Sequence, residues 1–410
     1  MQPIAITGLG IVSPSGIDKR KFWANVSRGR CAVERITRFD ASRYASHVAG
    51  QVHELNAYSN VSSRLLKKID LFSHMALVAS ELSLQDAKIN LEEEDKERIG
   101  IFMGNAIGGW LYAETELRDM YLEGREGVSP FMASAWFPAA PQGQISIYYG
   151  IKGYSKTVVS DRASSLMAIA YAAKTINHGK AYFILAGGME APVTPYALLC
   201  CNTSGMLTKR NDTPTSAYRP FDKTRDGFAI AEGAGVVILE PQERVKKRGA
   251  HAYAHIIGYG TTTDAVDRIN PAQDGVVLAR AIFLALEDAK LEVRNIDYIC
   301  LDGAGTQLGD VTETKAIKQV FNGYSKKIPC SAPKSVFGNM LGASGALDVI
   351  TTVLAMEHSL VPPTINLNNP DPMCDLDFCP NQAQSKEIKH ALVINRGRGG
   401  INAVMVLSKN

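Results

Sequence analysis

The segment at 158–166, VVSDRASSL, contains two adjacent hydroxyls directly after an apolar, strand-like stretch. Ser164 and Ser165 would begin the helix predicted over 163–178, where free backbone N–H groups and the helix dipole favour negative charge. A serine nucleophile also needs a base, and no His accompanies these residues in a recognisable motif. We therefore favour helix capping over nucleophilic catalysis for both hydroxyls.

The seven cysteines form no pattern that is typical of a metal site. Their number is odd, no Cys-x-x-Cys pair occurs, and no His or Cys pair at ligand spacing supports Cys200, Cys201, Cys374 or Cys379. The first residues carry no signal-type segment, and no apolar run reaches the length of a membrane span. These features predict a cytoplasmic protein with free thiols, no metal and no membrane.

The composition is that of an ordinary globular protein. Of 410 residues, 46% are hydrophobic. The chain has 44 basic and 41 acidic residues, which gives a net charge of +3. The basic run at 244–248 is short and isolated, so we interpret it as a solvated surface. Neither feature supports a nucleic-acid partner.

Short β-rich runs alternate with longer helical patterns, which favours sheets layered with helices. Strands are predicted at 3–9, 98–103, 157–160, 182–186, 236–239, 252–257, 298–301, 392–394 and 403–407, and helices at 65–84, 163–178, 276–289 and 343–356.

The two halves of the chain show the same order of elements. A strand, a glycine turn and a helix occur at 98–120 and again at 298–320. A strand, a small-residue turn and a buried helix occur at 157–178 and again at 329–356. The polar segment 241–250 is the best boundary, so we predict halves at 1–248 and 249–410, the first with insertions.

An ordered set of motifs resembles the ketoacyl synthase branch of the thiolase superfamily. The set spans the whole chain: ITGLGIVSPSG at 6–16, RPFD at 219–222, RDGF at 225–228, EGA at 232–234, LGD at 308–310, PKS at 333–335 and LGA at 341–343. The resemblance implies a duplicated α/β fold with two mixed β-sheets and buried helices in an α/β/α/β/α arrangement.

In that family a Cys at the N-terminus of the central helix takes the acyl chain as a thioester. The helix dipole lowers the pKa of such a thiol, and backbone N–H groups can hold an oxyanion. Two His residues assist decarboxylation of the malonyl unit and stabilise the enolate that attacks the thioester.

This chain departs from the family at all three positions. Arg162 stands where the Cys belongs, Ala304 where the first His belongs and Asn339 where the second belongs. A guanidinium is permanently protonated and cannot be a nucleophile. The last His residues, at 358 and 390, lie outside both loops, so no shift of the alignment restores the pair.

The chain-length factor of type II polyketide synthases, or ketosynthase β subunit, is the subfamily that tolerates such losses. The stretch at 131–147, FMASAWFPAAPQGQISI, and the loop RGRGGIN at 396–402 resemble it. Active synthases carry a Phe gate where this chain has Arg398. Chain-length factors commonly have Gln at the nucleophile position, so Arg162 argues against decarboxylation there. Arg162 is either a plug in the vacant acyl site or the result of drift.

The resemblance also predicts a tunnel wall. The family's gate positions fall on Trp110, Ala113 and Leu117, whose spacing puts them on one helical face. Because Trp is the largest side chain, we expect a product of about an octaketide or shorter. The alternative is that Trp110 is an ordinary core aromatic.

Chain-length factors pair with an active ketosynthase, and the strand before the nucleophile helix, here 154–160, pairs across the dimer axis. The implied interface residues are Phe131, Trp136, Phe137 and Val158. An acyl carrier protein would dock mainly on the active subunit and carry the substrates on its phosphopantetheine, so no cofactor of this chain is implied.

Two other functions stay open. One is an active thiolase-fold acyltransferase with an atypical nucleophile such as Cys300, Cys330 or Ser164. The other is the partner subunit of a polyene or fatty-acid-type synthase, which differs only in its product.

Overall fold

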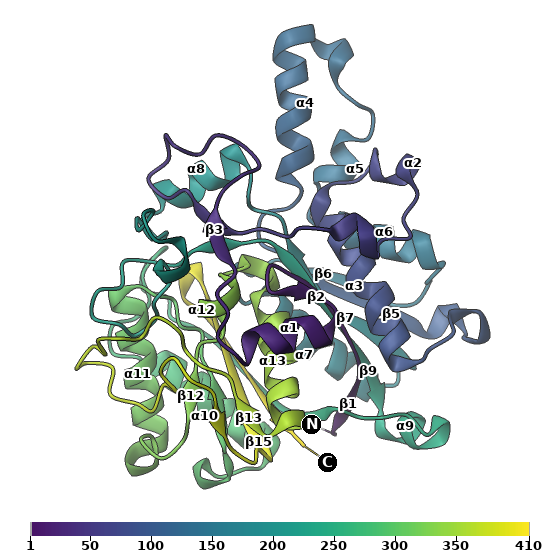
Figure 1. Cartoon of the computed structure of the whole chain (residues 1–410). Helices are drawn as coiled ribbons and strands as arrows, with labels where there is room; N and C mark the ends of the chain where they lie inside the picture. The colour runs from purple at the N-terminus through teal and green to yellow at the C-terminus, as the bar shows by residue number, and fades with distance from the viewer. Residues whose placement is uncertain (1, 410) are drawn as a thin grey trace.

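The computed structural model describes residues 2–409, and its centre is one eleven-stranded mixed sheet in the order β12-β11-β15-β16-β10-β1-β9-β7-β5-β6, with β2 (Gly16–Ile17) paired to β1 (Figure 1). The main strands are β1 (Ile4–Ser13), β5 (Ile99–Gly104), β6 (Ser155–Val158), β7 (Phe183–Glu190), β9 (Gly233–Pro241), β10 (Ala254–Thr263), β11 (Tyr298–Cys300), β12 (Cys330–Ser331), β15 (His390–Gly397) and β16 (Ile401–Ser408).

The sheet is a duplication. From β1 outward, β9 and β7 follow antiparallel and β5 and β6 parallel; from β10 outward, β16 and β15 follow antiparallel and β11 and β12 parallel. The thiolase-like fold and the repeated element order are therefore confirmed. The two expected sheets are joined into one, because β1 and β10 pair over three residues, from Ile4↔Ile256 to Ile6↔Ala254.

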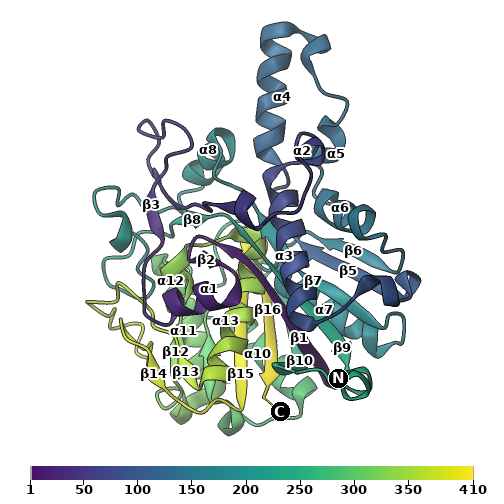
Figure 2. The same ribbon diagram turned by 45° about the vertical axis from the view of Figure 1, so that its right-hand side comes forward.

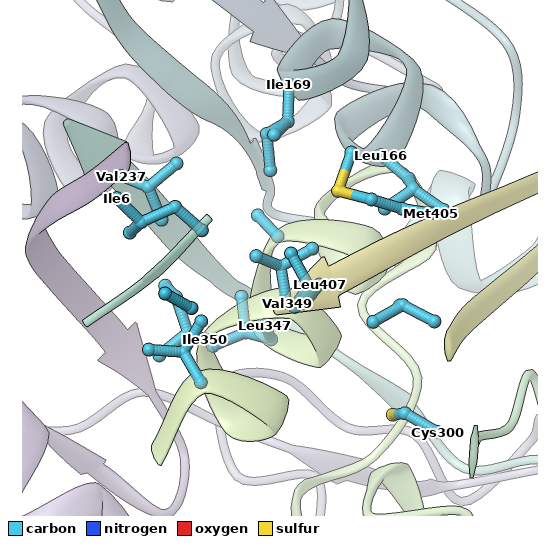
Figure 3. Packing of buried hydrophobic residues seen from close by; sticks show 14 of the residues in the cluster. Ile6, Leu166, Ile169, Val237, Cys300, Leu347, Val349, Ile350, Met405 and Leu407 are labelled. Carbon is cyan, nitrogen blue, oxygen red and sulfur yellow. The ribbon is translucent and has the colours of Figure 1, made fainter. Parts of the chain in front are cut away.

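Two buried helices lie side by side at the centre, α7 (Ser164–Asn177) after β6 and α13 (Ser344–His358) after β12. Gly345 permits their close approach, since a Cβ there would lie 2.6 Å from the backbone nitrogen of Leu166. Figure 3 shows Leu166 and Ile169 of α7 with Val349 and Ile350 of α13 in the apolar core.

Outer helices complete the layers. α3 (Leu71–Ala87) packs on β1 and β9, and α10 (Val276–Ala289) packs on β10 and β16. The helix predicted over 65–84 is wrong in its start: a short α2 (Ser63–Leu66) ends first, and extended Asp70 caps α3 with its side chain. The other predicted helices and strands occur at their expected places, with bounds shifted by a few residues.

The remaining elements surround this core. They are α1 (Lys19–Val26), α4 (Trp110–Glu123), α5 (Met132–Trp136), α6 (Ala140–Tyr149), α8 (Pro195–Thr203), α9 (Gln242–Arg248), α11 (Gln307–Phe321), α12 (Lys334–Phe337), and the small sheets β3 (Val33–Arg35), β4 (Val48–Gly50), β8 (Ile230–Ala231) and β13 (Leu360–Val361), β14 (Gln384–Ser385). In both views α4 projects from the body (Figure 2). Within residues 2–409, no helix has the length and apolarity to cross a bilayer.

Candidate functional site

The turn between β6 and α7 places Arg162 just before the buried helix. Asp161 adopts a left-handed conformation, with φ of 49°, which turns the chain sharply. The Ser164 hydroxyl donates to Asp161 O at 2.6 Å and accepts from Ser160 N at 2.8 Å, while Ser165 Oγ accepts from Ala346 N. The predicted capping of this helix is therefore wrong: the N-cap of α7 is Ala163, which has no capping side chain. Ser164 bonds the turn before α7, and Ser165 accepts from the first turn of the other buried helix, α13.

Arg162 is buried, with 6% of its surface exposed. Its Nε lies 3.5 Å from Asp161 Oδ2 and its Nη1 lies 4.0 Å from Asp302 Oδ2, while its guanidinium carbon lies 5.9 Å from the centre of the Phe228 ring. Within residues 2–409, neither of these nitrogens has a hydrogen-bond acceptor. Burial lowers the pKa of Arg162, but the carboxylates of Asp302 and Asp161 outweigh it, and the pKa is raised. The side chain is a buried, permanent cation.

Ala304 lies in the loop after β11 and lines the same cavity as Arg162. This cavity measures about 180 Å³, and Asp302, Arg396 and Asn402 also line it. Arg396 is tied down by Gly309 O at 3.1 Å and Thr312 Oγ1 at 2.9 Å. The methyl group of Ala304 supplies no titratable group to this space.

Asn339 follows α12 and is fully buried. Its Oδ1 accepts from Leu341 N at 3.0 Å and from the Ser344 hydroxyl at 3.1 Å, so it organises the start of α13. Its side chain also lies against the hydroxyl of Tyr218, which donates to Gly303 O at 2.6 Å. Tyr218 thereby connects the loop of Ala304 to that of Asn339.

Sequence reasoning missed Tyr218. Burial raises the pKa of its hydroxyl well above the ordinary value, with Asp302 adding to the effect, so it stays a neutral donor. The signal in the sequence was its place directly before the RPFD motif at 219–222. Arg162, Ala304 and Asn339 therefore lie around one buried region. The hydroxyl of Tyr218 connects the loops that carry Ala304 and Asn339.

Paired charges hold the surrounding loops. The ammonium of Lys334 pairs with Asp348 and donates to Leu301 O at 3.2 Å, with both charged side chains fully buried. Burial raises the pKa of Glu313 to about 8, with the Asp302 charge adding to it, and Glu313 accepts from Asp302 N at 2.8 Å. These contacts give the cavity a rigid frame.

The loop between β15 and β16 covers this place. Arg398 N donates to Asp161 Oδ2 at 2.7 Å, and the Arg398 side chain, 33% exposed, has its Nε 3.9 Å from Asp161 Oδ1. Gly397 and Gly400 line the cavity. The glycine-rich loop is thus a turn over the site.

The expected gate residues lie apart, on the projecting helix α4. The Trp110 ring packs 4.7 Å from the Tyr196 ring and 6.2 Å from the Trp136 ring, Ala113 is buried, and Leu117 is 39% exposed. A cavity of about 240 Å³ adjoins the neighbouring face of this helix, at Leu111, Glu114, Thr115 and Arg118. The assignment of a tunnel wall stays a prediction.

The expected interface residues cluster near α5 and β6. Phe131, Trp136 and Phe137 are exposed, and Phe137 is 55% exposed. Val158 is buried within its own chain, whereas its neighbour Val159 is exposed. Strand β6 ends the sheet and pairs with β5 on one side only among the described strands.

No cluster of three or more His, Cys, Asp or Glu side chains suited to a metal ion occurs among residues 2–409. All seven cysteines are free. Burial raises the pKa of Cys201 to about 11 and that of Cys300 further, so both stay protonated thiols.

Comparisons with known proteins find similarity to one protein family along nearly the whole chain. The family model described as beta-ketoacyl synthase, N-terminal domain, matches residues 1–244, and the C-terminal domain matches residues 253–368. The chain is 37% identical over 406 residues to 3-oxoacyl-[acyl-carrier-protein] synthase 2 of Staphylococcus aureus (strain COL), covering 99% of this chain and 98% of the relative. A protein of the same name from Synechocystis has the same identity and coverage.

Solved structures of similar proteins also superpose on the full length of this chain. One is described as AntDE:AntF, a type II PKS acyl-carrier protein in complex with its ketosynthase bound to the hexaketide; it has a TM-score of 0.93 and 32% identity and covers both chains fully. Another is the ishigamide ketosynthase/chain length factor, with a TM-score of 0.92, 30% identity, and coverage of 100% of this chain and 99% of that one.

Proposed function

Because the chain belongs to the beta-ketoacyl synthase family, we propose that it is the catalytically silent, chain-length-determining subunit of a heterodimeric type II polyketide ketosynthase. The observation that carries the proposal is Arg162, a buried cation held between Asp161 and Asp302 at the start of α7. A guanidinium there fills the place of a thiolate and cannot form a thioester.

The other substituted positions support the same function. Decarboxylation of a malonyl unit needs donors that stabilise the enolate oxygen, which imidazole groups supply in active relatives. Here the side chain of Ala304 has no donor. The Oδ1 of Asn339 is an acceptor held by Leu341 N and the Ser344 hydroxyl, so Asn339 offers only its neutral amide N–H groups in place of an imidazole.

An active acyltransferase with another nucleophile is the weaker proposal. Ser164 already donates to Asp161 O, and burial raises the pKa of the Cys300 and Cys330 thiols far above neutrality. A protonated thiol in an apolar core is inert.

The partner would be an active ketosynthase with an intact Cys-His-His set. In support, β6 ends the sheet, so its outer edge can accept another strand, and Phe131, Trp136 and Phe137 expose aromatic surface in and around α5. One structural relative is a ketosynthase/chain length factor, and another is bound to an acyl carrier protein. In the heterodimer, Trp110, Ala113 and Leu117 would form one wall of the product tunnel.

The test is expression of this chain with and without the ketosynthase encoded beside it. Each preparation is incubated with malonyl- and acetyl-carrier protein, and intact-protein mass spectrometry records acyl adducts. We expect adducts on the partner alone and polyketide product only from the heterodimer. A soluble homodimer of this chain that becomes acylated would overturn the proposal, and an adduct on Cys300 would favour the acyltransferase.

A further inference from the structure

Asp70 lies between the N-termini of two helices and is buried, with 2% of its surface exposed. Its Oδ1 accepts from Phe72 N at 2.9 Å, in the first turn of α3, and its Oδ2 accepts from Tyr112 N at 2.7 Å, in the first turn of α4. The first N–H groups of a helix have no partner within it and carry partial positive charge. One carboxylate therefore caps two helices.

The start of α4 is shaped for this contact. Gly109 N donates to Trp136 O at 2.9 Å, and a Cβ on Gly109 would lie 2.8 Å from Asp70 Cβ and 2.6 Å from Ala135 O. Only glycine, which has no Cβ, permits so close an approach at this position. Asp70 thus holds the base of α4 through a direct contact for which the glycine makes room.

The far end of α4 has much less support. Met120, Tyr121 and Leu122 are exposed, and the helix projects from the body in Figure 2. At 1.5 Å per residue its fourteen residues reach about 20 Å. A small tilt at the base therefore displaces the far end by a larger distance.

We infer that Asp70 is the positioning residue that sets the direction of α4 and, through it, the placement of Trp110 and Leu117 in the tunnel wall. This inference rests on the proposed function. Glu114 reinforces the anchor from the other side, because it accepts from Tyr196 N at 3.0 Å and from the hydroxyl of Thr194, the N-cap of α8.

The test compares product lengths made by heterodimers that carry Asp70→Ala, Asp70→Asn or wild-type chain. Loss of a helix cap changes the ratio between the native and the displaced direction of α4 about fivefold. We expect Asp70→Ala to lower the ratio of native-length to other-length products about fivefold at unchanged heterodimer assembly. Asp70→Asn, which keeps one carbonyl acceptor, should fall between. Ser62→Ala, which removes the cap of α2, is the matched control and should leave the ratio unchanged.

Gly109→Ala provides a second test if Asp70→Ala does not fold, because the added Cβ displaces the base of α4 without removing a buried charge. It should broaden the product lengths in the same way. If Asp70→Ala and Gly109→Ala both gave wild-type product lengths while Trp110→Ala changed the lengths, the role of Asp70 would be overturned and the tunnel wall would stand. Wild-type lengths in all three would overturn the tunnel wall as well.

Discussion

The carboxylate of Asp161 accepts a hydrogen bond from the backbone N–H of Arg398 at 2.7 Å, which joins the turn before α7 to the loop between β15 and β16. The same carboxylate oxygen lies 3.5 Å from Nε of Arg162. One side chain thus holds the buried cation and the loop that covers it. Arg162 and Arg398, which stand where the resemblance predicts the Cys and the Phe of active synthases, are parts of one arrangement.

Removal of the Arg162 charge should destabilise the protein. Arg162→Met removes one of the cations near buried Asp302, Lys334 being another, and should cost up to about 3 kcal/mol in the free energy of unfolding. Urea unfolding followed by circular dichroism measures this. Arg125→Met, which breaks an exposed pair with Glu126, is the control and should change stability by under about 0.5 kcal/mol. Equal effects of the two variants would contradict the ion-pair account.

Loss of the Asp161 carboxylate should free the loop that carries Arg398. A hydrogen bond to a charged acceptor contributes about 1.5 kcal/mol, so Asp161→Ala should speed amide exchange in residues 397–400 roughly tenfold. Hydrogen–deuterium exchange with mass spectrometry reports this. Asp161→Asn keeps an acceptor and should exchange near the wild-type rate; protection of the loop in the alanine variant would show that other contacts hold it.

Glu190 should make stability fall as pH rises. Burial raises its pKa to about 8, although its carboxylate accepts from Ala106, Ile107 and Gly342 N–H groups. The unfolded pKa is near 4.5, so the native state binds the extra proton. This contribution is fully present below about pH 4.5, is lost progressively as pH rises toward 8, and levels off above it.

Glu190→Gln removes that proton and should flatten the pH dependence. The slope of unfolding free energy against pH should differ from wild type by up to about 1.4 kcal/mol per unit between the two pKa values. Urea titrations at several pH values give the slope. Parallel curves for wild type and variant would show that Glu190 is ionised in the native protein at neutral pH.

Truncation of Trp110 should lengthen the product. In the heterodimer, Trp110→Ala removes the bulkiest side chain of the predicted wall, so the tube extends and longer polyketides should appear by liquid chromatography–mass spectrometry. Leu111→Ala, on the neighbouring face of α4 beside the cavity of about 240 Å³, is the matched control. Identical product profiles for both variants would remove Trp110 from the wall.

A charge on the exposed aromatic surface should weaken the heterodimer. Phe137→Asp places a carboxylate in the proposed interface and should raise the Kd for the ketosynthase at least about tenfold. Analytical ultracentrifugation measures it. Phe283→Asp, on the exposed face of α10, should leave Kd unchanged. If both variants bind alike, the interface lies elsewhere.

The sequence by itself determined the fold family and the duplication, and it predicted the loss of the catalytic set. These depend on residue identity and order: the strand predicted at 3–9, which the structure extends to Ser13, and helix α10 follow from the hydrophobic pattern, and no His stands at 304 or 339. It misplaced the start of α3, because the periodicity runs through extended Asp70, which ends the preceding segment and caps α3 at Phe72 N while its other oxygen accepts from Tyr112 N.

Only the tertiary structure decided which side chains surround Arg162. Tyr218, Asp302 and Arg398 lie far from Arg162 in the chain, and folding brings them around Arg162, its neighbour Asp161 and the cavity. Hydrophobic periodicity reports which face of an element is buried but not which distant side chain it meets. The pairing of a buried cation depends on distances of a few ångströms, which arise only when both halves of the sheet close over α7 and α13.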